Sequence, residues 1–356
     1  MVEMTEEYSI RSHSINKSGI IMALNYESLH NHTTASDGHL DHLDLLAKGY
    51  AEGFGLMAFT DHDVLPNDEA LAKLKTYDGP MKWLTGVEIS SGLPKELGGG
   101  AASMFHIVGL FTDPNNLALR VHARKAVEAR DQRMQQMVKN LQALGFDITE
   151  EDCYADSGGE TVGRKNISRA LARSKGYEDV MDRLRKMMAA EAMEDMDVAM
   201  QYTRMLEGPY SDHPFVLFLS SDSYIEDVYV DYLYTTDMDE SVKLIRDAGG
   251  IAILAHWGTI QGKISIDLLR DILKAGRLDG VELRSSFQDD ESGEIEQKLT
   301  ALAEETGAAV TFGIDGHSNM QIEKFARNQP LAERTIGQTA KLIERFKPDL
   351  TFSNLK

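Results

Sequence analysis

The sequence predicts an α/β protein, because short apolar runs typical of buried strands alternate with amphipathic, helix-like segments. The strand-like runs occupy residues 56–62, 81–90, 104–111, 251–258, 280–286 and 308–317. The helix-like segments between the later runs cover residues 239–250, 265–277 and 292–307. Glycine ends the first and third segments and Ser265 precedes the second, as expected at helix ends. This alternation favours a sheet of parallel strands.

The middle of the chain breaks this alternation. Residues 114–145 read as one long helix, and the buried-strand pattern is lost from about residue 147 to residue 238. This stretch holds polar, Met-rich helices followed by an extended segment, and we expect Met193, Met196 and Met200 to pack a small helical core.

Three parts of the chain follow from these patterns. We expect residues 21–146 and 239–356 to form the α/β body and residues 147–238 to form a mainly helical insertion that covers one face of it. Residues 1–20 are expected to be an N-terminal tail, since they are acidic and polar and lack the basic start and apolar core of a signal peptide.

Composition narrows the classes of function. The chain has 356 residues, 42% of them hydrophobic, which is enough for a sizeable core. Its formal net charge of −20 disfavours long nucleic acid as a partner, because such binding needs basic surface. Cys153 is the single cysteine, which excludes an intrachain disulfide and fits a cytoplasmic location. The apolar run at residues 20–24 is too short to span a membrane. The sequence leaves the oligomeric state open.

Potential metal ligands stand at the ends of the strand-like runs. They are His30, His32, Asp61, His62, Glu88, His256, Asp315 and His317, and His106 lies early in its own run. His30 and His32 can point to one face, since residues i and i+2 of a strand do so. In parallel barrels the carboxyl ends of the strands converge on one face, which would bring these side chains together. Imidazole and carboxylate ligands together suit Zn, Mn or Fe.

Each of these residues also has an ordinary explanation. A single H-x-H is more often a pair of surface or turn histidines than a metal site, and His62 could cap a turn. A carboxylate that ends an apolar strand, such as Glu88 or Asp315, must be paired, solvated or metal-bound. The combination of so many ligand types at strand ends favours a metal site over these separate explanations.

The ordered motifs HNHTTASDG, FTDHD, GVEIS, FHIVGL, LAHWG and GIDGH closely resemble those of the PHP (polymerase and histidinol phosphatase) family. The resemblance covers residues 26–170 and 239–318. It is nearest to the bacterial subgroup of phosphoesterases that act on nucleotides or RNA 5′ ends. It implies a distorted (β/α)7 barrel with an insertion over the active-site face. It also implies a trinuclear type of metal centre, and we expect two to three divalent ions (Mn, Zn or Fe) to be bound there.

The resemblance also implies a role for each ligand. His30, His32 and Asp315 would bind one metal, and His106 and His256 a second, with Glu88 bridging two metals. The third metal would be bound by Asp37, His62 and His317. Asp61 would orient a ligand from behind, whereas Asp63 is expected to be structural and His39 a bystander.

Arginines are expected to neutralise the phosphate of a substrate, since the guanidinium group binds phosphate through two hydrogen bonds. Arg164 is the first candidate and Arg133 the second, although an Arg on a polar helix face is often only solvated. Lys165-Asn166 replaces the family's Pro-His, so Asn166 can still hydrogen-bond a substrate but cannot titrate. Trp257 replaces a Pro, and is expected either to stack on a planar substrate group or to pack.

The resemblance implies hydrolysis of a phosphate monoester, nucleotide-like or another small phosphorylated metabolite, by attack of a metal-bridging hydroxide. Glu88, Arg164 and Asp61 would carry or support this step. A cyclic phosphodiester or a histidinol-phosphate-like substrate is the alternative among enzymes. Amidohydrolase chemistry is disfavoured because no strand-end Lys stands out. A non-catalytic, metal-stabilised binding domain is the alternative outside enzymes, and the intact ligand set argues against it.

Overall fold

The computed structural model describes residues 25–99, 104–157, 161–231, 234–284 and 293–355. Within these ranges, eight strands form one sheet in the order β1-β2-β3-β4-β6-β7-β8, and β5 pairs with β3. The strands are β1 (Tyr26–Ser28), β2 (Phe54–Phe59), β3 (Lys82–Gly92), β4 (Phe105–Leu110), β5 (Thr236–Asp237), β6 (Ile251–Leu254), β7 (Gly280–Arg284) and β8 (Ala309–Phe312). The prediction of an α/β fold is confirmed, and each expected strand-like run overlaps a strand.

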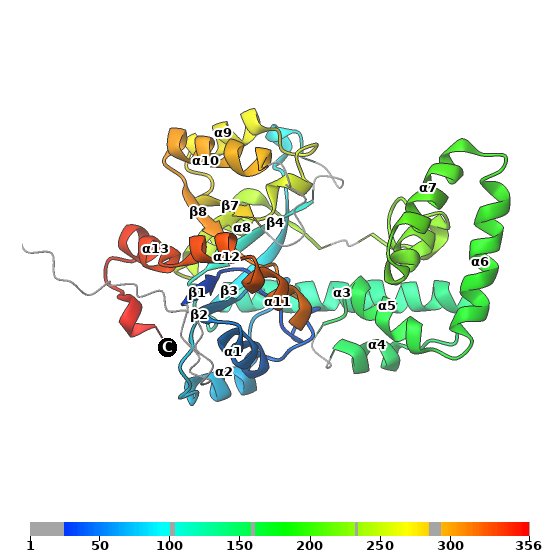
Figure 1. Ribbon diagram of the computed structural model, residues 1–356, viewed down its shortest axis with the longest axis horizontal. Coiled ribbons are helices and arrows are strands. Elements are labelled where there is room, and N and C mark those ends of the chain that lie inside the picture. Colours follow the sequence, from blue (N-terminus) through cyan, green and yellow to red (C-terminus); the bar gives the residue numbers. More distant parts are fainter. Residues whose placement is uncertain (1–24, 100–103, 158–160, 232–233, 285–292, 356) are drawn as a thin grey trace, which may run out of the picture.

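Helices of two kinds accompany the sheet (Figure 1). Those packed around the sheet are α1 (His42–Ala51), α2 (Asp68–Lys75), α8 (Met238–Asp247), α9 (Ile266–Lys274), α10 (Glu294–Thr306), α11 (Asn319–Arg327), α12 (Gln329–Ala332) and α13 (Gln338–Phe346). Those that extend to one side are α3 (Leu117–Ala143), α4 (Glu150–Ser157), α5 (Arg164–Arg173), α6 (Tyr177–Glu191) and α7 (Met196–Glu207). The long helix and the three later helices predicted from the sequence are therefore present.

Strand β4 departs from the parallel arrangement that the sequence suggested. It runs antiparallel to both of its neighbours, β3 and β6, whereas the other neighbouring pairs of strands are parallel. The reversal has a consequence for the site. The amino end of β4 lies at the edge where the parallel strands have their carboxyl ends, so the early position of His106 in its strand is the position that faces this edge.

The two outer strands of the sheet, β1 and β8, lie next to each other beyond their carboxyl ends. The backbone N–H of Leu29 donates to the carbonyl of Phe312 (3.3 Å), and that of Asp315 donates to the carbonyl of His30 (2.9 Å). The N–H of His32 in turn donates to the carbonyl of Gly316 (2.9 Å). These bonds bring the H-x-H segment beside the last strand, nearly 290 residues further along the chain.

The helices of the middle region have their own hydrophobic core, which corrects one expectation. Met193, Met196 and Met200 are 86%, 78% and 62% exposed and do not belong to it. On α7 the inward stripe is instead Val198, Tyr202 and Met205, which share one helix face. The core also takes in side chains from the second half of α3, so it begins before residue 147.

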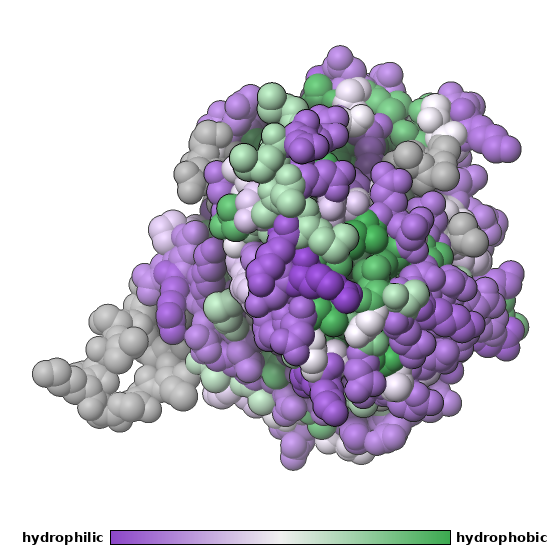
Figure 2. Space-filling model, turned by 90° about the vertical axis from the view of Figure 1, so that its right-hand side faces the viewer, coloured by the Kyte–Doolittle hydropathy of each residue, from purple (hydrophilic) through white to green (hydrophobic). Residues whose placement is uncertain are grey.

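The outward side chains of this region leave apolar surface exposed. The large exposed hydrophobic residues here are Met187, Met193, Met196, Met200, Leu206 and Tyr210. Figure 2 views the molecule from this side and shows apolar patches within a mostly hydrophilic face. Among the residues described, none of the helices combines the length and the apolar character needed to cross a bilayer.

Candidate metal centre

The nine predicted ligands converge at the edge of the sheet where the parallel strands end. His30 and His32 follow β1, His62 follows β2, and His256 follows β6. The others are Glu88 inside β3, His106 near the start of β4, Asp315 and His317 after β8, and Asp37 in the loop before α1. Three groups of their donor atoms have mutual distances within 4.8 Å. Eight of the nine residues belong to these groups, and His256 joins them through Glu88, whose Oε1 lies 3.1 Å from its Nε2.

The fully buried carboxylate of Glu88 lies at the centre of the cluster. Its two oxygens each face imidazole nitrogens from different strand ends. Oε1 lies 3.0 Å from His106 Nδ1 and 3.1 Å from His256 Nε2, and Oε2 lies 2.9 Å from His62 Nδ1, 3.1 Å from His30 Nε2 and 3.3 Å from His32 Nε2. A carboxylate with a separate set of ligands on each oxygen is placed to bridge two ions.

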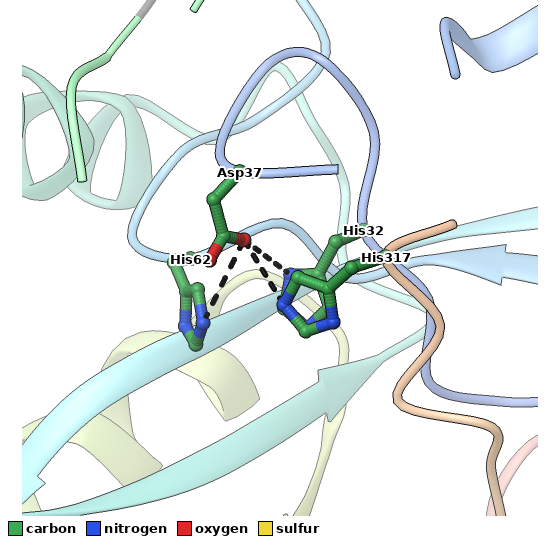
Figure 3. A group of neighbouring side chains, drawn as sticks. All are labelled: His32, Asp37, His62 and His317. Carbon is green, nitrogen blue, oxygen red and sulfur yellow. Dashed lines mark ion pairs between the residues drawn. The ribbon is translucent and has the colours of Figure 1, made fainter. Parts of the chain in front are cut away.

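Asp315 and Asp37 complete the cluster on either side of His32. Asp315 Oδ1 lies 3.1 Å from His32 Nε2 and 3.5 Å from His30 Nε2. Asp37 Oδ1 lies 3.1 Å from His317 Nε2, 3.8 Å from His32 Nδ1 and 4.0 Å from His62 Nε2 (Figure 3). The Asp37 group thus contains one carboxylate and three imidazoles, and the group around Asp315 contains two carboxylates.

The backbone is strained at two of the nine residues and at the residue that follows a third, His62. Asp63, His256 and Asp315 have positive φ angles of 54°, 31° and 53°, a region that residues other than glycine seldom adopt. Such strain persists where surrounding contacts enforce it and is concentrated at functional sites. Here it turns the chain at the ends of β2, β6 and β8.

The charges of the cluster are strongly coupled. Burial alone would raise the pKa of Glu88, but the imidazoles of His62, His30 and His106 hold this pKa well below its usual range. Burial alone would lower the pKa of His30, yet the carboxylates of Glu88, Glu282 and Asp315 raise it well above its usual range. The carboxylates are thus in the ionised form that a cation requires.

The donor set fits divalent metal ions. It combines imidazole nitrogens with carboxylate oxygens, which suits Mn, Zn or Fe better than an all-oxygen site would. Several buried donor atoms also lack a hydrogen-bond partner among the residues described, namely Glu88 Oε2, His62 Nδ1 and Asp37 Oδ1. Buried polar atoms are normally satisfied, so donors that face one another without hydrogen bonds are consistent with ligands around an ion.

Asp61 supports the cluster from behind, as expected. Its Oδ1 accepts hydrogen bonds from Thr33 N (2.7 Å) and Ser36 Oγ (2.6 Å), and its Oδ2 accepts one from Thr33 Oγ1 (2.8 Å). Ser36 Oγ lies in turn 3.5 Å from His32 Nδ1. Asp61 therefore fixes the loop that carries Asp37 and acts on His32 through Ser36.

Glu282 of β7 is a site residue that the sequence reasoning missed. Its Oε1 lies 3.0 Å from His30 Nδ1, and its Oε2 accepts the backbone N–H of His256 at 3.0 Å. Gly313 makes room for this contact, since a Cβ there would lie 2.7 Å from Glu282 Oε1. A carboxylate behind a ligating imidazole fixes its orientation and tautomer. The signal was present, because Glu282 interrupts an apolar strand as Glu88 does.

A wall of cationic side chains faces the cluster across a pocket. Arg130 and Arg133 of α3 and Arg164 and Lys165 of α5 line this pocket together with Asp37, His62 and His106. Arg133 Nε donates to the carbonyl of Val230 (2.7 Å), and Arg164 Nη1 donates to that of Leu219 (3.1 Å). Burial and the neighbouring Arg164 lower the pKa of Arg133 to about 10, so it stays charged at neutral pH. Arg130 was not expected from the sequence.

Two predicted substrate-binding residues do not reach this pocket. Asn166 is buried, and its side chain caps α5 by accepting from Gly163 N (2.8 Å) and contacts Asp156 (3.3 Å). Trp257 is 2% exposed, and its Nε1 donates to the carbonyl of Ile264 (2.7 Å). Both placements contradict direct contact with a substrate: Asn166 serves the start of a helix, and Trp257 packs in the core, which was the other expectation for it.

Asp63 anchors Arg130, in line with its expected structural role. It accepts from Arg130 Nη2 and from Ser90 N and Oγ, both at 2.7 Å, and it is 1% exposed. Burial alone would raise the pKa of Asp63, but Arg130 and His122 hold it far below its usual range.

Replacing Asp63 with Asn is expected to lower the free energy of unfolding by about 3 kcal/mol, because it removes one partner of a buried ion pair. Urea unfolding followed by circular dichroism measures this loss. The matched control is Asp68→Asn, which removes the partner of Arg120 at the surface, where Asp68 is 86% exposed. The control is expected to cost less than about 1 kcal/mol, and equal losses in the two variants would contradict the anchoring role of Asp63.

Comparison with known proteins gives relatives at low identity. No family model matches the chain. It is 26% identical over 296 residues to a 3′,5′-nucleoside bisphosphate phosphatase of Chromobacterium violaceum, which covers 82% of this chain and 86% of that protein. It is 25% identical over 311 residues to a 5′-3′ exoribonuclease of Haemophilus influenzae, covering 86% of this chain and 96% of the relative.

Two further comparisons extend this picture. A phosphoribosyl 1,2-cyclic phosphate 1,2-diphosphodiesterase of Eggerthella lenta is 25% identical over 301 residues, covering 85% of this chain and 95% of the relative. A solved structure from Bifidobacterium adolescentis, named as a candidate metal-dependent phosphoesterase, matches the fold with a TM-score of 0.58 at 23% identity, covering 82% of this chain and 87% of that chain. The ordered motifs, the ligand cluster that they build and these relatives together support a relationship to the PHP family, nearest to its nucleotide and RNA phosphoesterase subgroup.

Proposed function

We propose that this protein is a metal-dependent phosphoesterase that hydrolyses a small phosphorylated substrate, nucleotide-like or another metabolite. The single observation that carries the proposal is the position of Glu88, whose two oxygens face five imidazoles from the ends of four strands. The cationic wall of Arg130, Arg133 and Arg164 opposite the cluster supports an anionic substrate. The names of the relatives supply the reaction class.

Two to three divalent ions would be held by the nine residues of the cluster. Glu88 would bridge two of them, with His106 and His256 on one side and His30, His32 and Asp315 on the other. Asp37, His62 and His317 would hold the third. When bound, such ions neutralise phosphoryl oxygens and activate water for attack on phosphorus.

Other residues around the cluster would orient the substrate and the metal ligands. Arg164 and Arg133 would bind phosphate oxygens from the side opposite the cluster, since both line the pocket and both are fixed by backbone carbonyls. Asp61 would keep Asp37 in place through the loop at residues 33–37.

The architecture proposed with this function is a distorted (β/α)7 barrel. The hydrogen bonds between the segments after β1 and β8 support closure of the sheet. Residues 147–238 would form the cap over the active-site face, which is supported by the contribution of α5 to the pocket wall.

Replacing Arg164 with Ala is expected to lower kcat/KM by about 10- to 100-fold, mainly through a higher KM, because a charge-assisted hydrogen bond to phosphate is lost. Initial-rate kinetics on the best substrate measures the change. The matched control is Arg204→Ala on α7, since Arg204 forms an ion pair with Asp222 at the surface. Unchanged kinetics in the Arg164 variant would contradict its role in binding.

A panel of substrates tests the proposed function itself. It includes an aryl phosphate, an aryl phosphodiester, a 5′-nucleotide, a 3′,5′-bisphosphate and a cyclic phosphate, each assayed with Mn²⁺ and after metal removal. Faster turnover of the cyclic phosphate would favour the second candidate function, a cyclic phosphodiesterase, which the relative from Eggerthella lenta suggests. Bound metal without turnover of any phosphoester would favour a non-catalytic binding domain.

A further inference from the structure

Lys165 places a positive charge beside one end of the ligand cluster. Its Nζ lies 3.4 Å from Asp37 Oδ2, while the other oxygen of the same carboxylate, Oδ1, lies 3.1 Å from His317 Nε2. Lys165 also lines the pocket beside His62. One carboxylate therefore contacts an ammonium group through one oxygen and faces a group of metal ligands through the other.

The ion-binding groups of the cluster consequently differ in charge. The group of His30, His32, Glu88 and Asp315 has two carboxylates, which give it a formal charge of −2 when its imidazoles are neutral. The Asp37 group has one carboxylate, and the ammonium of Lys165 cancels its charge. Coulomb attraction for a divalent cation is weaker at a neutral group than at one of charge −2.

The position of Lys165 is fixed by the docking of α5. Lys165 is the second residue of this helix, whose start is capped by the Gly163–Asn166 hydrogen bond (2.8 Å). One turn further along, Arg169 Nη1 donates to the backbone carbonyl of Asp37 (3.4 Å) and to His39 Nε2 (3.1 Å). The helix and the loop that carries Asp37 are thus tied together, which holds the base of the Lys165 side chain beside the carboxylate.

We propose that Lys165 acts as a built-in cation at the Asp37 end of the cluster, so that a divalent ion binds there more weakly than at the groups around Glu88. At limiting metal, the ions occupy the Glu88 groups and the ammonium of Lys165 neutralises Asp37 in place of a third ion. A third ion on Asp37 Oδ1 would be repelled by the ammonium that contacts Oδ2 of the same carboxylate. The inference rests on the proposed function only in taking the cluster as a divalent-metal site.

Titration of the metal-free protein with Mn²⁺ tests this inference. Isothermal calorimetry gives the affinities, and equilibrium dialysis with elemental analysis gives the number of bound ions. The wild-type protein is expected to bind its last ion at least about tenfold more weakly than the others. Lys165→Met is expected to tighten that last ion at least about tenfold, as Coulomb's law gives for a unit charge removed at roughly 5 Å in a water-like medium. Lys165→Arg should keep the wild-type pattern.

Two further variants assign the effect to this site. Adding Asp37→Asn to Lys165→Met should abolish the gain in affinity. Lys186→Met removes the same charge from an exposed position on α6 and should leave all affinities unchanged. Equal affinities in wild type and Lys165→Met, or an equal gain in the Lys186 variant, would overturn the inference. A protein that binds these ions but hydrolyses no phosphoester would refute the proposed function and leave this comparison intact.

Discussion

Replacing Glu88 with Gln is expected to lower kcat/KM for phosphoester hydrolysis by at least about 1000-fold, since both ions that we propose the carboxylate to bridge would lose a charged ligand. The amide of the Glu88→Gln variant keeps the size of the side chain. It presents an N–H group to imidazoles that face a carboxylate oxygen in the wild-type protein. Elemental analysis is expected to find less bound metal in the variant, and the phosphate-release assay measures the loss of activity.

A second buried glutamate provides the matched control. Glu27 of β1 is 4% exposed, and its carboxylate accepts from Gly337 N (2.9 Å) and Thr339 N (2.7 Å) at the start of α13, not from the cluster. Burial raises the pKa of Glu27. Glu27→Gln should retain activity and metal content. If Glu88→Gln folds, as judged by its circular dichroism, and still hydrolyses the substrate at the wild-type rate, the proposed function is wrong.

Six of the eight strands described could be predicted from the sequence because each lies in a short apolar run, whereas β1 and β5 do not. The direction of the strands could not be read from that pattern. Strand β4 was expected to be parallel and is antiparallel. The connection from β3 to β4 did hold a signal, because residues 93–104 contain no segment of helical length and pattern. Parallel neighbours need a crossover of a dozen or more residues, usually a helix, whereas antiparallel neighbours do not.

The helical region was harder to predict. Met193, Met196 and Met200 suggested a core by their hydrophobicity, but their side chains lie on the exposed face. The inward face of α7 follows the spacing of Val198, Tyr202 and Met205, at positions i, i+4 and i+7. Helix α7 therefore has two apolar faces, one with Met196 and Met200 and one with Val198, Tyr202 and Met205. Only the packing of α7 against its neighbours determines which face is buried.

The residues of the cluster could be selected from the sequence because their chemistry is local, whereas the residues that support them depend on tertiary contacts. His30 and Asp315 closely follow a strand and Glu88 lies in the second half of one, and each has a side chain of a type that binds metal, so both properties can be read from the sequence. The contacts of Arg130 with Asp63 and of Lys165 with Asp37 arise only when α3 and α5 dock beside the sheet. No spacing along the chain encodes the contacts between these elements.

Removing the divalent ions with a chelator is expected to abolish hydrolysis and to lower the free energy of unfolding by about 4 kcal/mol, relative to protein held at roughly 1000 times the dissociation constant. The ions bind the folded cluster and not the dispersed ligands of the unfolded chain, so their binding free energy adds to stability. Urea unfolding with and without Mn²⁺ measures the difference. Return of activity when Mn²⁺ is added back separates metal removal from irreversible damage.

The stabilisation of the fold by bound divalent ions is expected to increase with pH. The sign follows from the pKa shifts of the histidines in the cluster. In the metal-free fold, nearby carboxylates overcome the effect of burial and raise the pKa of His30 and His256 above the usual value. Their contribution to stability is complete below about pH 6.5 and is lost as the pH rises through their folded-state pKa values. Burial lowers the pKa of His106, so this residue destabilises the fold at low pH. That destabilisation disappears as the pH rises to about 6.5, and His106 adds no further pH dependence above this value.

Above that pH the metal-free protein should therefore become less stable as the pH rises. Metal affinity should increase over the same range, because each imidazole must lose its proton to bind an ion. The gap in unfolding free energy between loaded and metal-free protein should thus widen from about pH 6.5 to about pH 8. A gap that stays constant or narrows over this range would mean that His30 and His256 do not bind the ions, even if activity requires metal.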